Sequence, residues 1–319
     1  RCGKPSTALR WAAAPPAYAR DREQAIIESW RAAVSTFDLM LPTAATDLAN
    51  TIRSTLAYIL INRDGVAIHP GSRSYERSWI RDGSLTATAL LRYGLAKEAR
   101  DFVDWYAPYQ FESGKIPCVV DRRGPDPVPE NDSHGQFIMA VMNIYRFTGD
   151  QAFLAKHWPR VQKAVAYIES LRAQRMTPEY QDPNTKATHQ EPGKPEVSLH
   201  AFFGLVPESI SHEGYSAKPM HSYWDDFFIL RGLKDAAEMA RVLDDKQHVE
   251  HYQQLADDFA GALYSSIKLT MKTHGIDYIP GCVELGDFDA TSTTVALWPC
   301  GELGRLPRAA LDRTFDKYW

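Results

Sequence analysis

The stretch Trp79-Ile80-Arg81-Asp82-Gly83-Ser84-Leu85 stands directly before a run of residues with helical periodicity. It combines an aromatic ring, a guanidinium and a carboxylate. The ring offers a flat apolar face to a sugar, and the two charged groups offer donors and acceptors to its hydroxyls. A simpler interpretation makes Asp82 the N-cap of the helix and Arg81 its ion partner. The helices and connections in the rest of the chain decide between sugar binding and helix capping.

Apolar residues at helical spacing dominate the chain and predict an all-α fold. The expected helices lie at about 21–38, 46–60, 84–93, 99–106, 134–147, 151–174, 222–243, 247–268 and from 290 on, with a further one over 306–319. Pro159 should split its helix, because proline lacks the backbone donor and clashes with the preceding turn. Only 64–80 and 115–121 have a strand-like pattern.

The connections between these helices alternate in length. The tight ones are at Gly94, 148–150 and 244–246, and the long ones are 64–80, 111–132, 175–221 and 269–289. Antiparallel helices that follow one another place successive connections at opposite ends, so all the long connections should share one end. Long loops inside compact domains are commonly functional. The spacing therefore predicts a toroid of helical hairpins with an active-site rim, its inner helices starting near 81, 132, 222 and 290.

The long connections are rich in chemically useful side chains. The rim segments are 79–82, 129–135, 207–215, 221–226 and 284–289. Asp132, Asp225 and Asp289 could each cap the helix that follows. Capping accounts for one acid in each loop, but not for the Trp, Tyr and His residues of the same segments.

Composition narrows the function classes. The chain has 319 residues, a formal charge of −4 and a pI near 6.2, which gives no basic surface for nucleic acid. Its apolar runs are too short to span a membrane. The four cysteines are scattered without a CxxC pair, and His212-Glu213 lacks the second histidine of a zinc protease motif. We expect no cofactor and no catalytic metal.

The order of these residues resembles the six-hairpin (α/α)6 glycosidases, the superfamily that includes glucoamylase and its bacterial relatives. The W-x-R-D segment that binds the non-reducing sugar in that superfamily corresponds to Trp79-Ile80-Arg81-Asp82. The N-D-x-x-G segment that opens its second inner helix corresponds to Asn131-Asp132-Ser133-His134-Gly135. The resemblance covers about 45–319 and implies a lead-in segment over 1–40 and a catalytic toroid over 41–319.

The resemblance also implies a Glu as general acid in the loop before the third inner helix. Glu213 has the family interval to the helix start near His221, and Glu208 is its rival. The glucoamylase W-E motif is absent, since His212 precedes Glu213. The residues expected to bind substrate are Trp79, Arg81, Asp82, Asp132, His134, Trp224, Asp225 and Asp287.

The catalytic base has no assigned residue. About four of the six family hairpins are present, and the base of the family lies near the end of the fifth or sixth. We therefore expect the natural protein to continue past Trp319. Glu284, Asp287 and Asp289 are expected to be sugar ligands or structural groups.

The resulting interpretation is a glycoside hydrolase with a carbohydrate partner, exo-acting and inverting by family resemblance. A glycoside phosphorylase, a sugar epimerase or a polysaccharide lyase on the same toroid is one alternative. His134, His212 and His221 keep it open, because an epimerase or lyase uses His or Tyr as proton carriers. A non-catalytic carbohydrate-binding protein is the other alternative.

Overall fold

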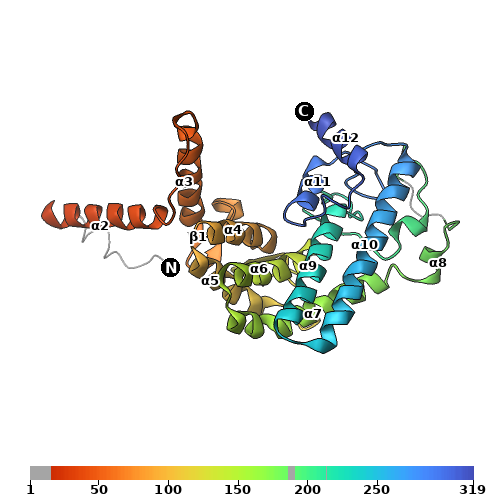
Figure 1. Ribbon diagram of the computed structural model, residues 1–319, viewed down its shortest axis with the longest axis horizontal. Helices are drawn as coiled ribbons and strands as arrows, with labels where there is room; N and C mark the ends of the chain where they lie inside the picture. Colours follow the sequence, from red (N-terminus) through yellow and green to blue (C-terminus); the bar gives the residue numbers. More distant parts are fainter. Residues whose placement is uncertain (1–15, 186–190, 213) are drawn as a thin grey trace. The chain divides into compact units, whose positions relative to one another are not determined.

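The computed structural model of the protein describes residues 16–185, 191–212 and 214–319. Two compact units are present: Arg1–Ile61 with Arg92–Leu95, and Asn62–Leu91 with Ala96–Trp319. Figure 1 shows the helices of both. The expected boundary near residue 40 stays a prediction.

Over its described residues, the first unit has the helices α2 (Pro16–Val34) and α3 (Thr46–Ile61), with the short 3-10 helix η1 (Thr43–Ala45) before α3. Tyr93 links two segments of this unit by hydrogen bonds. Its hydroxyl donates to the carbonyl of Ile52 at 3.2 Å, and its backbone carbonyl accepts from the Thr36 hydroxyl at 2.7 Å. The apolar stripe expected along α3 is only partly covered, and Leu48 is 56% exposed.

The second unit is built on four inner helices, α4 (Ile80–Arg92), α6 (Asp132–Thr148), α9 (Tyr223–Val242) and α11 (Ala290–Leu297). Each begins within one residue of the predicted start. Asn143 of α6 donates to Thr88 of α4 at 3.1 Å, and α9 packs on both α6 and α11.

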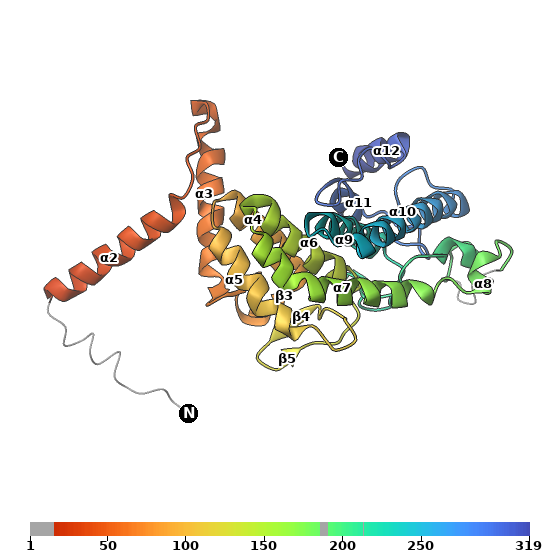
Figure 2. The same ribbon diagram turned by 60° about the horizontal axis from the view of Figure 1, so that its bottom comes forward.

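An outer helix follows each inner one after a tight turn or a short connection. The outer helices are α5 (Ala96–Tyr106), α7 (Gln151–Ala173), α10 (Lys246–His274) and α12 (Arg308–Tyr318). Helix α5 packs on α6, α7 on α6 and α9, α10 on α9, and α12 on α11 (Figure 2). The buried residues of α5, Ala99, Phe102, Val103 and Tyr106, lie at helical spacing on one face. The predicted series of helical hairpins is confirmed.

The long connections contain short elements of their own. Strands β1 (Arg63–Asp64) and β2 (Ala67–Ile68) form an antiparallel pair, and β3 (Ser78–Trp79), β4 (Val119–Asp121) and β5 (Gly124–Pro125) form an antiparallel sheet in that order. The short helices are η2 (Arg73–Tyr75), η3 (Ala107–Tyr109), α8 (Pro178–Gln181) and η4 (Leu199–Phe202). Most of these strand residues lie in the two segments predicted to have strand character, 64–80 and 115–121, whereas β5 lies just beyond the second segment.

Helices α6 and α9 approach each other unusually closely. A Cβ atom on Gly135 would lie 1.9 Å from the carbonyl oxygen of Phe228, and one on Gly232 would lie 2.6 Å from the Cα of Gly135. These contacts are shorter than any side chain allows, so only glycine fits at both positions. The close approach lets residues in the first turns of the two helices hydrogen-bond to one another.

The predicted break at Pro159 is wrong. Helix α7 runs unbroken from Gln151 to Ala173 with Pro159 inside it. Neighbouring residues hold it in place, since Trp158 and Val161 are buried and the Trp158 indole donates to Asp245 at 2.9 Å. Tertiary packing therefore outweighs the one intrahelical hydrogen bond that proline removes.

Two further findings concern the described residues only. None of their helices is long and apolar enough to cross a membrane. Cys118, Cys282 and Cys300 are buried and free.

Candidate active site

The first turns of α4, α6 and α9 bring together a group of charged and aromatic side chains. We call it the central cluster, and its members are Arg81, Asp82, Glu130, Asp132, Trp224 and Asp225. Arg81 organises one side of it: its Nη1 donates to Glu130 Oε2 at 2.8 Å and lies 3.9 Å from Asp132 Oδ2, while its Nε lies 3.7 Å from Asp82 Oδ2. The Glu130 and Asp132 side chains are almost fully buried. Helix N-termini favour such carboxylates, because the helix dipole places partial positive charge there.

Asp132 joins α6 to α9. Its Oδ2 accepts from the Trp224 indole Nε1 at 2.8 Å and from Gln136 Nε2 at 2.8 Å. The structure confirms that the helix starts of two separate hairpins meet here. It also shows how a fully buried carboxylate is kept satisfied, since each donor offsets part of its lost hydration.

The capping interpretation holds for one acid and fails for the others. Asp289 is the N-cap of α11 and accepts from the backbone N–H groups of Thr291 and Ser292. Asp82 and Asp225 each stand third in their helix, and the cap position before Asp132 is Asn131. Asp132 and Asp225 therefore face the cluster rather than their own helix ends.

Asp225 holds the loop that precedes α9. Its carboxylate accepts from the hydroxyls of Ser209 and Ser211, the latter at 2.8 Å. Ser211 has a φ of 53°, a left-handed conformation that L residues seldom adopt, and the bond to Asp225 helps to fix it. Burial, together with the charge of Asp132, raises the pKa of Asp225 to about 7. Near neutral pH this carboxyl is therefore partly protonated.

The segment around residue 212 lies against α9 and the 280–289 loop. The His212 ring stacks on Trp224 with centroids 4.6 Å apart, and its Nε2 is 3.5 Å from Asp289 Oδ2. Burial alone would raise the pKa of Asp289, but the hydrogen bonds from His212 and Ser292 outweigh it and lower that pKa to about 2.

Tyr215 ties the same segment to the 280–289 loop. Its hydroxyl donates to Asp287 Oδ2 at 3.0 Å, and Asp287 Oδ1 also accepts from the backbone of Cys282 at 3.1 Å. Asp287, predicted to bind substrate, thus organises this loop, and its contact with a sugar stays a prediction. Glu213, the predicted general acid, lies outside the described residues.

Two predicted sugar ligands are packed into the protein. Trp79 is 7% exposed and packs with Cys118 and Val119, with the Arg77 guanidinium over its ring. His134 is fully buried, and its Nδ1 accepts from the backbone N–H of Ile116 at 3.2 Å. Burial lowers the pKa of His134 to about 3, so it is neutral. In this structure both residues support neighbouring loops, and a role in sugar binding stays a prediction for each.

Glu208 lies apart from the central cluster. It is ion-paired with Arg175, and its Oε2 is 3.5 Å from His221 Nε2. Ser209, the next residue, contacts Asp225 instead. The chain is extended here, where Ser209 pairs with Met220, and neighbouring side chains of an extended segment point to opposite faces.

Several residues of the site carry no recognisable signal in the sequence. Ser209, Ser211 and Arg175 stand in a long loop without periodicity, and only tertiary contacts give them a role. Glu130 could have been found, since it directly precedes the Asn131-Asp132 pair. Within the described ranges, no group of three or more His, Cys, Asp or Glu residues is arranged to hold a metal ion.

Comparisons with known proteins agree with this architecture. Residues 73–276, more than half of the chain, match the family of the bacterial α-L-rhamnosidase six-hairpin glycosidase domain. No curated protein matches the chain.

Solved structures share the fold at low sequence identity. A glycosidase with one substitution is similar with a TM-score of 0.60 and 17% identity over 87% of this chain and 72% of that chain. A glycosidase variant in complex with glucose gives a TM-score of 0.58 with the same identity and coverage. An α-L-rhamnosidase from Dictyoglumus thermophilum gives 0.46 and 16% identity over 69% of this chain and 23% of that chain. The two glycosidases confirm the predicted helical toroid.

Proposed function

This chain belongs to the family of bacterial α-L-rhamnosidase six-hairpin glycosidase domains, and we propose that it removes a terminal sugar with inversion, using Glu213 as the general acid. Its family and its fold identify it as a glycoside hydrolase acting on carbohydrate. The exo mode, the inverting mechanism and the identity of the general acid are our own proposals beyond this family assignment.

The arrangement of Arg81 in the central cluster carries this proposal. A guanidinium held among Asp82, Glu130 and Asp132 offers fixed donors and acceptors to adjacent hydroxyls of one ring. A terminal sugar presents free hydroxyls at its non-reducing end, where an internal unit carries the next sugar. A charged network of this kind therefore favours exo action.

The proton donor must be a carboxylic acid that stays protonated near the working pH. Glu208 is poorly suited to this task. Its partial burial would raise its pKa, but a backbone hydrogen bond and the positive charge of Arg175 outweigh burial and lower the pKa. The choice of Glu213 rests on its place in the sequence and on its described neighbours, His212 and Tyr215, which contact the cluster and the 280–289 loop.

Two variants and two kinds of substrate test the acid. The substrates are disaccharides and 4-nitrophenyl glycosides, each carrying terminal α-L-rhamnose or α-D-glucose. A general acid matters most when the leaving group is basic. We therefore expect Glu213→Gln to lower disaccharide turnover about 10²- to 10⁴-fold and to spare the nitrophenyl substrate.

The matched control is Glu208→Gln, which removes the rival carboxylate of the same loop and should not discriminate between the two substrates. If Glu213→Gln lowers turnover of both substrates equally, or if only Glu208→Gln discriminates between them, Glu213 is not the general acid.

The anomer formed first tests inversion. Proton NMR during the first minutes of turnover should show the anomer opposite to that of the substrate, before mutarotation mixes the two. Retention would disprove the inverting mechanism. Formation of a sugar phosphate when phosphate is added would instead identify a phosphorylase.

A further inference from the structure

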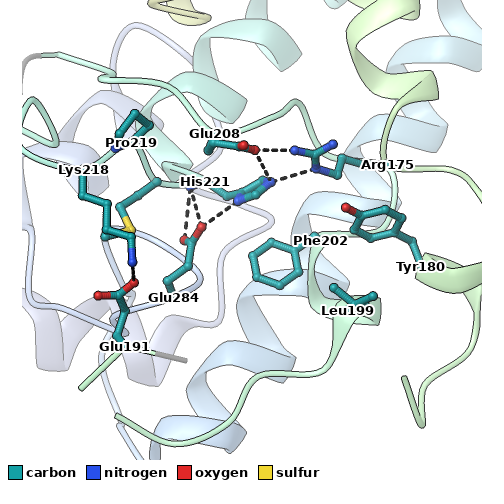
Figure 3. A pocket seen from close by; sticks show the side chains of 11 residues that line it. Arg175, Tyr180, Glu191, Leu199, Phe202, Glu208, Lys218, Pro219, His221 and Glu284 are labelled. Atoms are coloured by element: carbon teal, nitrogen blue, oxygen red, sulfur yellow. Dashed lines mark hydrogen bonds and ion pairs between the residues drawn. The ribbon is translucent and has the colours of Figure 1, made fainter. Parts of the chain in front are cut away.

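A cavity of about 350 Å³ lies beside the 175–221 connection, outside the central cluster. We call it the outer cavity. As Figure 3 shows, its lining includes a polar network and a group of aromatic side chains. Arg175, Glu208, His221 and Glu284 form a connected polar network, and Tyr180 and Phe202 form an apolar, aromatic wall.

The backbone around residue 209 separates this cavity from the central cluster. Glu208 contacts Arg175 in the cavity, whereas Ser209 contacts Asp225 in the cluster. The same division recurs at the start of α9, where His221 contacts Glu284 and Ser222 contacts Ser211. The cavity is thus a site distinct from the proposed catalytic centre.

The hydrogen bonds of this network determine which ring nitrogen of His221 carries the proton. Arg175 Nε donates to His221 Nε2 at 2.9 Å, and because arginine always carries this proton, His221 Nε2 must be the acceptor. The proton of the neutral imidazole is then on Nδ1, which donates to Glu284 Oε1 at 2.7 Å. Glu284 also accepts from the backbone N–H of His221.

Two of the three carboxylates that line the cavity are matched by cationic partners. Glu208 pairs with Arg175, and Glu191 pairs with Lys218. A charged ligand would have to compete with these ion pairs. Each carboxylate still has lone pairs beyond those used, which suits neutral hydroxyl donors.

The aromatic wall adjoins the polar network and offers apolar surface to a sugar ring. The Arg175 guanidinium lies 5.5 Å from the centre of the Tyr180 ring, and Phe202 packs on His221 with centroids 4.4 Å apart. Pockets of about 300–1,000 Å³ with an apolar lining and a few polar groups are typical of small-ligand sites.

We propose that the outer cavity is a second sugar-binding site, which takes one neutral sugar unit between its aromatic wall and its carboxylates. The inference rests on the proposed function in that it takes this unit to be part of the carbohydrate substrate. Binding outside the catalytic centre would then favour longer saccharides over short glycosides.

Saturation-transfer NMR titrations of the whole chain with free L-rhamnose and free D-glucose test the site without relying on turnover. The Asp82→Asn background weakens binding in the central cluster, and Tyr180→Ala is added to remove half of the aromatic wall. We expect at least one of the two sugars to bind to Asp82→Asn, and its Kd to rise about tenfold or more in the double variant, because ring stacking is lost.

Tyr318→Ala in the same background is the matched control, since Tyr318 is an exposed tyrosine outside the cavity, and Tyr180→Phe should retain binding. If neither sugar binds to Asp82→Asn, or if Tyr180→Ala leaves the Kd unchanged, the outer cavity is not a sugar site. Sugar binding that depends on Tyr180, in a protein without hydrolytic activity, would instead uphold the cavity and disprove the proposed function.

Discussion

Asp225 of the central cluster contacts Ser209, the residue next to Glu208 of the outer cavity, yet different groups donate to the two carboxylates. Asp225 is buried and receives the hydroxyls of Ser209 and Ser211, and its pKa is raised to about 7. Glu208 is paired with the cation Arg175, and its pKa is lowered. Neutral donors together with burial therefore allow an acid to keep a proton, whereas a cationic partner keeps it ionised. One loop supplies both environments.

The largest effect should come from Asp132→Ala. The substitution leaves the Trp224 indole and the Gln136 amide without their acceptor inside the protein. We expect the free energy of unfolding to fall by about 3 kcal/mol, as measured by chemical denaturation. Glu208→Ala in the outer cavity is the comparison, and its half-exposed ion pair should cost about 1 kcal/mol or less. Equal losses of unfolding free energy at Asp132 and Glu208 would mean that the burial of a carboxylate does not determine the cost of its removal.

A smaller effect is expected on catalysis from Asp82→Ala. Asp82 lies beside Arg81 at the partly open side of the central cluster, where it is proposed to accept from a sugar hydroxyl. Loss of one charge-assisted hydrogen bond should lower kcat/KM about 10- to 100-fold. Asp312→Ala, which removes another carboxylate paired with an arginine but at an exposed site, is the control and should leave kcat/KM unchanged. Unchanged turnover and affinity in Asp82→Ala would leave Asp82 with a structural role only.

The last contrast concerns the pH dependence of unfolding, which has opposite signs in the two regions. Because the pKa of Asp225 is raised when the protein folds, its contribution to stability is full below about pH 4 and is lost as the pH rises through about 7. Asp225→Asn should remove this part of the pH dependence of unfolding.

Glu208→Gln should change the pH dependence of unfolding in the opposite direction. The lowered pKa of Glu208 contributes stability above its unfolded value, and that contribution is lost as the pH falls through the folded-state value. Denaturation curves from pH 3 to pH 8 measure both. The same sign of change in both variants would contradict the contrast between the two regions.

Local patterns were enough to predict the architecture. The starts of α4, α6, α9 and α11 follow from turn residues and apolar stripes that span only a few residues each. The alternation of tight and long connections then placed the functional residues at the first turns of the inner helices, where Arg81 and Asp132 meet.

Contacts between distant residues escaped prediction. Arg175 and His221 are far apart in the sequence, and the connection between them has no periodicity that would bring them together. The Pro159 prediction failed for a related reason, because a local rule was outweighed by the packing of α7. The sequence also placed Glu208 and Glu213 in one loop without showing that Glu208 turns toward Arg175.

The two glycines where α6 and α9 touch set the spacing of the two helices that carry the central cluster. Neither Gly135 nor Gly232 carries a functional group, but together they fix how near Asp132 comes to the Trp224 indole. Adding a single methyl group at either position would separate the two helices and widen the space between their first turns. Attempts to alter the substrate specificity of this glycoside hydrolase should therefore include these two positions, along with the side chains of the central cluster.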